Sequence, residues 1–540
     1  MYSNITTGAV HGIDSYLIQV ETDISDGLPS FNMVGFMSGE VREAGERVRV
    51  ALRNLGIYLP PRRITVNLSP AGIPKRGIVI DIPVCVGLLI CLGYIKEEAT
   101  EGVLVAGEVG LNGEIRPVKG ILPIVIEARE RGIHTCLVPR GNLAEGALVH
   151  GVRVVGVCTL AELVNYLRKD PDERDLFLPP MEADAEELLR RHYAGDYADL
   201  SDIHGQSQAK KVLEIAAAGF HNVLMTGPPG TGKSMLARCL PGIMPPLTPE
   251  EALEVTRIYS VAGRLTEEDG LITERPFIAP HHSVTKAALI GGGNIPAPGL
   301  ISLAHMGVLF LDELPEYPAA ELNLLREPLE THEITIRRMQ GAYRYPAKML
   351  LVAAANPCPC GYYPDMNRCR CTPFQVQNYQ RRISGPFLDR IDFRVSVNRV
   401  SADELQGMHE EERSEVVRGR VIEAIERQKH RFAGTPFSYN ADMDVQAVEK
   451  YCALDSQLAA KMRMVYEQIG MSARAYHKTL KMARTIADLD GREKILERDL
   501  MMAVGFRMPE KDTQESKAPA GEYNSNMKIK PLNRQGGHRW

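Results

Sequence analysis

Long apolar segments are missing from this 540-residue sequence. The longest candidate, residues 78–90, is interrupted by Asp81 and Pro83, and no run reaches the ~20 residues that a membrane-spanning helix needs. The first residues, MYSNITTGAVHGID, also lack the basic start and apolar centre of a signal peptide. We therefore expect a cytoplasmic protein without a membrane segment.

A strong excess of charge of one sign is missing as well. The formal net charge is -5, so any binding to nucleic acid must come from a local basic surface and not from global attraction. No repeat of fixed period is present, which disfavours a solenoid. Hydrophobic residues make up 44% and charged residues 24%, the balance of a folded globular protein.

Changes in composition predict five segments along the chain. Residues 1–170 combine short strands with helices and predict one α+β domain, and residues 171–201 mix acidic residues with proline as a linker does. Residues 202–400 alternate helices with very apolar strands, which is typical of a parallel sheet buried on both faces. Residues 401–510 predict a helical lid, and the polar residues 511–540 predict a disordered tail.

Apolar periodicity predicts individual helices within these segments. In the first domain they cover residues 40–55 and 120–131. In the lid they cover residues 411–432, 444–469 and 473–487.

A glycine-rich loop, GPPGTGKS, occupies residues 227–234 between a strand and a helix, the context that a phosphate-binding loop requires. Its backbone N–H groups are expected to surround the β-phosphate of ATP, while Lys233 neutralises phosphate oxygens and the Ser234 hydroxyl holds Mg²⁺. The expected nucleotide contacts are Gly227, Pro228, Pro229, Gly230, Thr231, Gly232, Lys233, Ser234 and Met235. The sequence therefore predicts ATP and Mg²⁺ as ligands.

Two further strands end in polar side chains. The strand VLFL is followed by Asp312 and Glu313, which are expected to order the Mg²⁺ shell and to activate the attacking water. The strand MLLVAAA is followed by Asn356, which is expected to orient that water. Solvated turn acids, and an asparagine chosen for its turn before Pro357, are the alternative interpretations.

Several longer motifs carry a family resemblance. They are DIHGQ at 202–206, RPFIAPHHS at 275–283, GGGNIPAPGLISLAHMGVLFLDELPE at 291–316, AANPCPCG at 354–361, ISGPFLDRID at 383–392 and SARAYHKTLKMARTIADL at 472–489. Over nearly its full length the chain resembles the ComM/YifB family of magnesium-chelatase-like AAA+ proteins. The resemblance implies a homohexameric ring with ATP between subunits, which drives DNA branch migration in homologous recombination and natural transformation. A recombinase is a further possible partner, which the resemblance does not identify.

The resemblance also assigns single residues by position. Arg390 in LDRID resembles the arginine finger that reaches a neighbour's ATP, and Arg474 in SAR resembles sensor 2. Ile203 and His204 resemble the segment that packs on adenine. For the two arginines an ordinary surface salt bridge is the alternative.

Residues 331–346, THEITIRRMQGAYRYP, alternate apolar and polar side chains around Gly341 and predict a β-hairpin with Arg337 and Arg338 near its turn. The resemblance places this hairpin in the pore of the ring. Paired guanidinium groups repeated around a ring would bind DNA phosphates without reading sequence. A solvated hairpin with no ligand is the alternative.

Four of the ten cysteines are clustered in the pattern C-x-C-x8-C-x-C. They are Cys358, Cys360, Cys369 and Cys371. Four thiolates within fourteen residues predict a tetrahedral Zn²⁺ site. Because the spacing is tighter than the common C-x2-C, reduced cysteines without a metal remain the alternative.

The first domain resembles the proteolytic domain of Lon, a fold of the ribosomal S5 domain 2 type, at residues 104–140 and 66–84. Proteolysis by that domain needs a serine and a lysine base. The serine position falls near Val79 and the lysine position near Leu122 or Ile124, so we expect no protease activity.

The expected fold is therefore an AAA+ P-loop ATPase core with a helical lid, preceded by an α+β Lon-protease-like domain. The first functional hypothesis is an ATP-driven hexameric DNA motor. The alternative is a chaperone-like ATPase that remodels a protein or drives metal insertion. A binding module that uses ATP only to switch its assembly state is disfavoured by Glu313, Asn356 and Arg390.

Overall fold

The structure, a computed structural model, describes residues 1–507 apart from 73–74, 76–78, 192–196, 294–295, 340 and 401–410. The tail expected at 511–540 and the first ten residues of the expected lid lie outside the described residues. Within the described part, every helix is too short or too polar to cross a bilayer.

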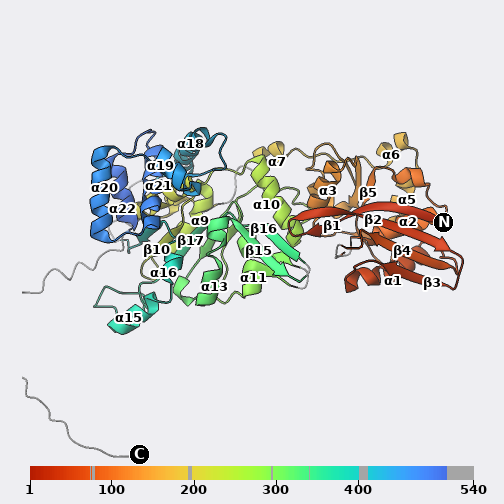
Figure 1. The fold of residues 1–540 in the computed structure, drawn as a ribbon, viewed down its shortest axis with the longest axis horizontal. Helices are drawn as coiled ribbons and strands as arrows, with labels where there is room; N and C mark the ends of the chain where they lie inside the picture. Colours follow the sequence, from red (N-terminus) through yellow and green to blue (C-terminus); the bar gives the residue numbers. More distant parts are fainter. Residues whose placement is uncertain are drawn as a thin grey trace, which may run out of the picture. The chain divides into compact units, whose positions relative to one another are not determined.

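The amino-terminal domain is built on a seven-stranded sheet with the order β3-β4-β2-β1-β5-β8-β9 (Figure 1). Its strands are β1 (Tyr2–His11), β2 (Asp14–Ser25), β3 (Ser30–Val34), β4 (Arg63–Ser69), β5 (Val103–Val105), β8 (Thr135–Pro139) and β9 (Arg153–Val157). β1 pairs antiparallel with β2 and β2 with β4, whereas β5, β8 and β9 pair in parallel. A two-stranded ribbon of β6 (Glu108–Val109) and β7 (Ile115–Arg116) stands apart.

Helices pack on this sheet through apolar residues. They are α1 (Gly39–Asn54), α2 (Asp81–Cys91), α3 (Ile121–Glu130), α4 (Leu143–Gly146) and α5 (Leu160–Arg168). α2 is buried on nearly every residue, because it lies under the sheet and against α1. Its buried Asp81 receives two hydrogen bonds, of 2.7 and 2.8 Å, from the guanidinium of Arg47 on α1. A buried carboxylate needs such a partner.

The expected linker contains two helices, α6 (Pro171–Phe177) and α7 (Ala185–Arg191). Between them, Met181 forms a β-bridge with Val154 on the edge strand β9. This part of the linker is therefore attached to the amino-terminal sheet.

The next domain holds a five-stranded parallel sheet with the order β11-β14-β17-β10-β18. The strands are β10 (Val223–Thr226), β11 (Phe277–Ile278), β14 (Val308–Leu311), β17 (Leu350–Ala355) and β18 (Phe393–Ser396). All residues of β14 and β17 are buried, which confirms the expected parallel sheet covered on both faces.

Helices and two hairpins surround this sheet (Figure 1). The helices are α8 (Ser207–Gly219), α9 (Lys233–Ile243), α10 (Pro249–Ala262), α11 (Lys286–Ile290), α12 (Leu300–Leu303), α13 (Ala319–Leu324), α14 (Pro328–Thr331), α15 (Pro373–Gln380) and α16 (Gly385–Leu388). The hairpins are β12 (Gly291–Gly292) with β13 (Ala297–Pro298), and β15 (Glu333–Arg338) with β16 (Gly341–Pro346).

The remaining helices form the lid: α18 (Ser414–Phe432), α19 (Val445–Tyr451), α20 (Ser456–Ile469), α21 (Ala473–Leu489) and α22 (Glu497–Arg507). α18 and α21 pack on α8 of the core. The single helix predicted at residues 444–469 is wrong, because α19 and α20 are separate. The Asp455 side chain accepts a hydrogen bond of 2.8 Å from the backbone N–H of Leu458 and so caps a new helix.

Candidate functional site

The glycine-rich loop connects β10 to α9, and its lysine points back onto it. Lys233 Nζ donates to the carbonyl oxygens of Gly227 at 2.7 Å and Pro228 at 2.8 Å, and lies 3.3 Å from Asn356 Oδ1. Burial lowers the pKa of Lys233. Gly230 and Gly232 have φ angles of +75° and +87°, which favour glycine and let the loop curl around its own N–H groups.

The carboxyl end of β14 brings two acids to the same edge of the sheet. Ser234 Oγ donates to Asp312 Oδ2 at 2.7 Å, so the hydroxyl and carboxylate expected to share Mg²⁺ are adjacent. Asp312 in turn accepts a 2.9 Å hydrogen bond from the Glu313 N–H. Because hard cations prefer such oxygen ligands, these donors fit Mg²⁺.

Glu313 itself is held in an unusual backbone conformation. Its φ angle is +50°, in the left-handed region that non-glycine residues rarely adopt. Its carboxylate is half exposed, and Oε2 lies 3.7 Å from Nδ1 of His282. The His282 ring lies 4.0 Å from that of His281.

β17 lies between β14 and β10, so Asn356, which follows β17, comes between the acids and the phosphate loop. The carboxyl ends of parallel strands meet at one edge, where ligands of such sheets bind. The structure thus brings together Lys233, Ser234, Asp312 and Asn356.

The two arginines assigned by resemblance converge elsewhere. Arg390 Nη2 lies 2.8 Å from Glu330 Oε1, and the Arg474 guanidinium forms an ion pair with the same oxygen. Arg390 also donates to the carbonyl oxygens of Arg326 and Pro386. Burial opposes ionisation of Glu330, but Arg474 and Arg390 hold its pKa below the usual range. Among the described residues, neither arginine forms a hydrogen bond or ion pair with the phosphate loop.

A second ion pair attaches the lid to the core close to this one. Lys478, one turn after Arg474 on α21, lies 2.8 Å from Asp392, two residues after Arg390. Burial opposes ionisation of Asp392, yet Lys478, His221 and the N–H of Asn222 lower its pKa to about 2. Asp392 therefore pairs directly with α21, and Arg390 shares Glu330 with Arg474 of the same helix.

The residues expected near adenine lie between core and lid. Ile203 is buried and His204 is exposed. Next to them, the Gly205 N–H donates at 2.7 Å to Glu411, which lies just before the first lid helix, α18. Met235, in the first turn of α9, is half exposed.

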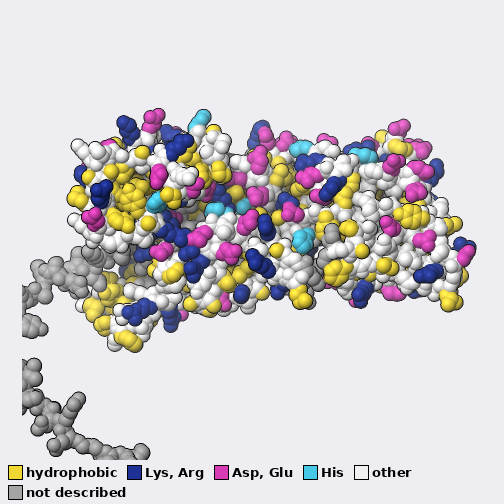
Figure 2. All heavy atoms as spheres, viewed as in Figure 1, with side chains coloured by type: hydrophobic (Ala, Val, Ile, Leu, Met, Phe, Trp, Pro, Cys, Tyr) yellow, Lys and Arg dark blue, Asp and Glu magenta, His cyan; other side chains and the backbone are white. Residues whose placement is uncertain are grey.

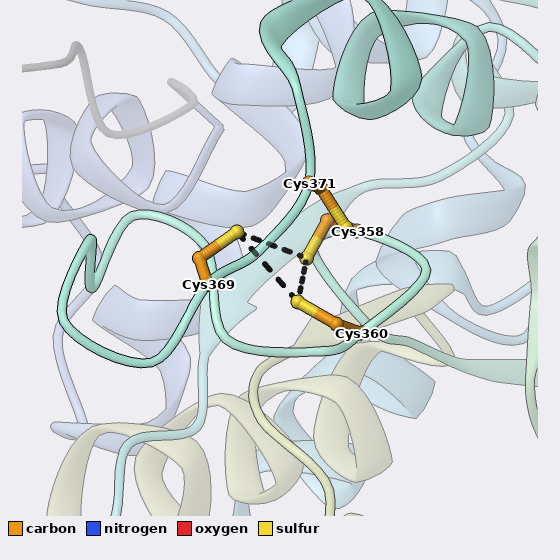
Figure 3. Close-up of side chains that lie close together, drawn as sticks. All are labelled: Cys358, Cys360, Cys369 and Cys371. Atoms are coloured by element: carbon orange, nitrogen blue, oxygen red, sulfur yellow. Dashed lines mark hydrogen bonds between the residues drawn. The ribbon is translucent and has the colours of Figure 1, made fainter.

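The four clustered cysteines converge, as Figure 3 shows. Their sulfur atoms all lie within 4.8 Å of one another, and three pairs are 3.4, 3.6 and 3.8 Å apart. Sulfurs bound to Zn²⁺ at about 2.3 Å in a tetrahedron are about 3.8 Å apart, so the spacing fits this metal. The N–H groups of Tyr362 and Arg370 lower the pKa of Cys360 to about 6.

The cysteine loop packs directly on the phosphate loop. Gly361 has a φ angle of +84°, and a Cβ there would lie 2.5 Å from Cδ of Pro229. Cys358 follows Asn356 by two residues, and Cys371 precedes the cap of α15. The cysteine loop therefore lies against the phosphate loop at Pro229 and begins two residues after Asn356.

The predicted hairpin of residues 331–346 is present as β15 and β16. Arg337 pairs with Ala342 and Arg338 with Gly341, so both arginines lie next to the turn and are exposed. Met339 at the turn is fully exposed. Arg338 Nη2 lies beside the β12–β13 hairpin, 3.5 Å from the Gly293 oxygen.

The positions aligned with the Lon dyad carry apolar side chains in the structure. Val79, Leu122 and Ile124 are all buried in the amino-terminal core. None of them offers a nucleophile or a base.

Three family models match successive parts of the chain. Family models described as "Subunit ChlI of Mg-chelatase", "Magnesium chelatase, subunit ChlI" and "Magnesium chelatase, subunit ChlI C-terminal" match residues 20–142, 199–405 and 411–507. The competence protein ComM of Haemophilus influenzae is 39% identical over 498 residues, covering 92% of this chain and 95% of the relative. The protein YifB of Escherichia coli is 39% identical over 510 residues, covering 94% and 97%.

This chain belongs to the ComM/YifB family of magnesium-chelatase-like AAA+ proteins. Lon protease 2 of Bacillus subtilis is 24% identical over 187 residues, covering 30% of this chain and 33% of the protease. The expected fold is confirmed: an AAA+ core with a helical lid follows an α+β Lon-like domain. Membership of the ComM/YifB family also indicates ATPase activity, with ATP and Mg²⁺ as ligands.

Two partners of the predicted site residues escaped the sequence analysis. His282 lies in the RPFIAPHHS segment, where the histidine pair was a visible signal without an assigned role. Glu330 gave no signal, because nothing in EPLE distinguishes it from an ordinary surface acid.

Proposed function

We propose that this member of the ComM/YifB family is an ATP-hydrolysing hexameric motor that moves branch points in DNA during homologous recombination and natural transformation. The observation that carries the proposal is the convergence of Lys233, Ser234, Asp312 and Asn356 at one sheet edge, with an arginine-tipped hairpin between β14 and β17 in the chain. The printed name of the relative ComM, a competence protein, supports the biological setting.

Each residue at the nucleotide site has a proposed task. Lys233 would neutralise the β- and γ-phosphates, and Ser234 with Asp312 would hold Mg²⁺. Glu313 would accept a proton from the attacking water, which Asn356 orients. Ile203 and His204 would contact adenine.

Arg390 would act as an arginine finger on the ATP of a neighbouring subunit, and Arg474 would act as sensor 2. Both form an ion pair with Glu330, and neither forms a hydrogen bond or ion pair with the phosphate loop of its own chain among the described residues. An arginine supplied across an interface stabilises charge in the transition state. The ring arrangement supplies such an interface.

The cysteine loop is proposed as a structural Zn²⁺ site formed by Cys358, Cys360, Cys369 and Cys371. The sulfur spacing supports it, and so does electrostatics, because four adjacent thiolates repel one another unless a cation lies between them. A closed four-thiolate site stabilises a loop and leaves no open position for catalysis.

Arg337 and Arg338 are proposed to bind DNA phosphates in the pore. Charged side chains of both signs are mixed over the face of the molecule in Figure 2. DNA binding therefore requires a local basic surface, such as the one that Arg337 and Arg338 form. Because β15–β16 lies between Asp312 and Asn356 in the chain, a change in nucleotide state can move it.

The test measures ATP turnover and unwinding with single-stranded, duplex and four-way DNA. Replacing Arg337 and Arg338 by alanine should leave basal ATP turnover intact, weaken DNA binding and abolish stimulation by DNA. The matched control is Arg344→Ala, an exposed arginine on the same hairpin that pairs with Thr335, further from the turn than Arg337 and Arg338. If the double variant unwinds as well as wild type, the pore assignment fails.

The alternative is a chaperone-like ATPase that remodels a protein or drives metal insertion, which the magnesium-chelatase family models favour. If wild-type protein with ATP neither binds nor unwinds forked or four-way DNA at low salt, this alternative replaces the DNA motor.

A further inference from the structure

A groove on the amino-terminal domain lies outside every site described above. It opens between the start of β3, the last turns of α1 and residues 57–62, which lead into β4. Its volume is about 350 Å³. This falls within the ~300–1,000 Å³ range of small-molecule sites. Three arginines and two aromatic residues are among the residues that line it.

The groove has a positive surface. Arg49, Arg53 and Arg62 line it and are exposed, and no carboxylate is among the described residues of its lining. Two acids lie on the rim: Glu46 is 3.5 Å from Arg49, and Asp26 is 3.5 Å from Arg62. Both acids are strongly exposed, so solvent screens these pairs. Arg53 forms no ion pair among the described residues, which leaves its charge available.

The groove also presents aromatic surface. The Tyr58 side chain is 76% exposed and makes no ring contact within the described part of the chain. The second ring, that of Phe31, is paired with an arginine: the Arg49 guanidinium lies 5.6 Å from its centre. An exposed ring beside guanidinium groups can take a nucleobase by stacking, whatever the base.

We propose that this groove binds single-stranded DNA, with phosphates on Arg49, Arg53 and Arg62 and a base stacked on Tyr58. A duplex would satisfy the arginines but hides its base faces, so Tyr58 favours a single strand. The inference rests on the proposed function in that DNA is the ligand, and it adds a second contact outside the pore.

The test measures binding of a fluorescent single-stranded oligonucleotide to the full chain over a range of salt concentrations. Tyr58→Ala should weaken binding about fivefold or more, whereas Tyr58→Phe keeps the ring and should bind like wild type. Arg53→Ala should reduce the slope of log K against log salt by about 0.7. Binding to blunt duplex should change less than twofold in Tyr58→Ala.

The matched control is Arg129→Ala, because Arg129 is an exposed arginine in the last turn of α3, as Arg53 is in the last turn of α1. It should bind like wild type. All variants are also made with Arg337 and Arg338 replaced by alanine, so that pore binding cannot mask the loss.

The outcomes separate the two proposals. If wild type binds no DNA, both the motor and the groove assignment fail. If wild type binds and unwinds DNA while Tyr58→Ala and Arg53→Ala match Arg129→Ala in both backgrounds, only the groove assignment is overturned. It is also overturned if these variants change the oligomeric mass but not the affinity for DNA, since the groove would then contact a second copy of the chain.

Discussion

The ion pair between Asp392 and Lys478 should contribute strongly to the attachment of α21 to the core, and Asp392→Asn tests this. Lys478 is 15% exposed and Asp392 8%, so the substitution leaves a buried ammonium without its carboxylate. Burial already lowers the pKa of Lys478 to about 8. Removing one partner of a buried pair costs about 3–5 kcal/mol.

A second consideration limits the size of this loss. Without Asp392, Lys478 can release its proton in the folded state, while the unfolded lysine keeps a pKa near 10.4. At pH 7 that release costs about 1.4 kcal/mol for each of ~3.4 pH units, or about 5 kcal/mol. In the variant, the unfolded state then binds more protons than the folded state, so its stability should rise with pH between 7 and 10.

Hydrogen exchange of peptides from α21, Ala473–Leu489, measures the effect locally. A loss of 3–5 kcal/mol corresponds to exchange that is roughly 10²- to 10⁴-fold faster. The double variant Asp392→Asn with Lys478→Met removes both charges and should recover most of the protection. The reasoning would be refuted if α21 of Asp392→Asn exchanged at a rate within threefold of wild type. It would also be refuted if the double variant exchanged as fast as Asp392→Asn.

Three further predictions concern the nucleotide site and the cysteines. Glu313→Gln should bind ATP but lose turnover, because the amide cannot accept the proton of water; equal turnover in a steady-state assay would remove Glu313 from that role. Arg390→Ala should bind ATP and lose about 10³-fold in turnover, and mixing it with Lys233→Ala should restore part of the activity if the arginine acts across an interface; no recovery at any ratio would contradict that. Purified protein should carry close to one Zn²⁺ per chain by metal analysis, and metal-free protein with four titratable thiols and full activity would contradict the site.

Control substitutions accompany these tests. Lys211→Ala changes a partly exposed lysine on α8, whose ion-pair partner Glu214 keeps Arg420, and should leave ATP binding and turnover unchanged. Cys158→Ser changes an exposed cysteine outside the cluster and should leave the metal content unchanged.

Four of the five helices predicted from periodicity agree with the structure to within three residues at each end. The helix expected at 40–55 is α1, Gly39–Asn54, and the helix expected at 473–487 is α21, Ala473–Leu489. The exception is the pair α19 and α20, where apolar periodicity continues across a break. A cap at Asp455 ends that continuity, and periodicity alone cannot show a cap.

The sequence by itself determined the phosphate loop, the strands that end at Asp312 and Asn356, and the arginine hairpin. These features depend on neighbouring residues, because a loop between a strand and a helix, or a short β-turn, is set by contacts close in the chain. The parallel sheet followed from strands that are apolar throughout. Family resemblance then supplied Arg390 and Arg474.

Only the tertiary structure decided which distant groups meet. Glu330 contacts both Arg390 and Arg474, which lie 60 and 144 residues further along the chain, and no local pattern encodes such a contact. The groove at Tyr58 likewise depends on α1 and β3 packing side by side. Propensity and periodicity act over a few residues, whereas ion pairs and grooves form where packing brings remote segments within a few ångströms.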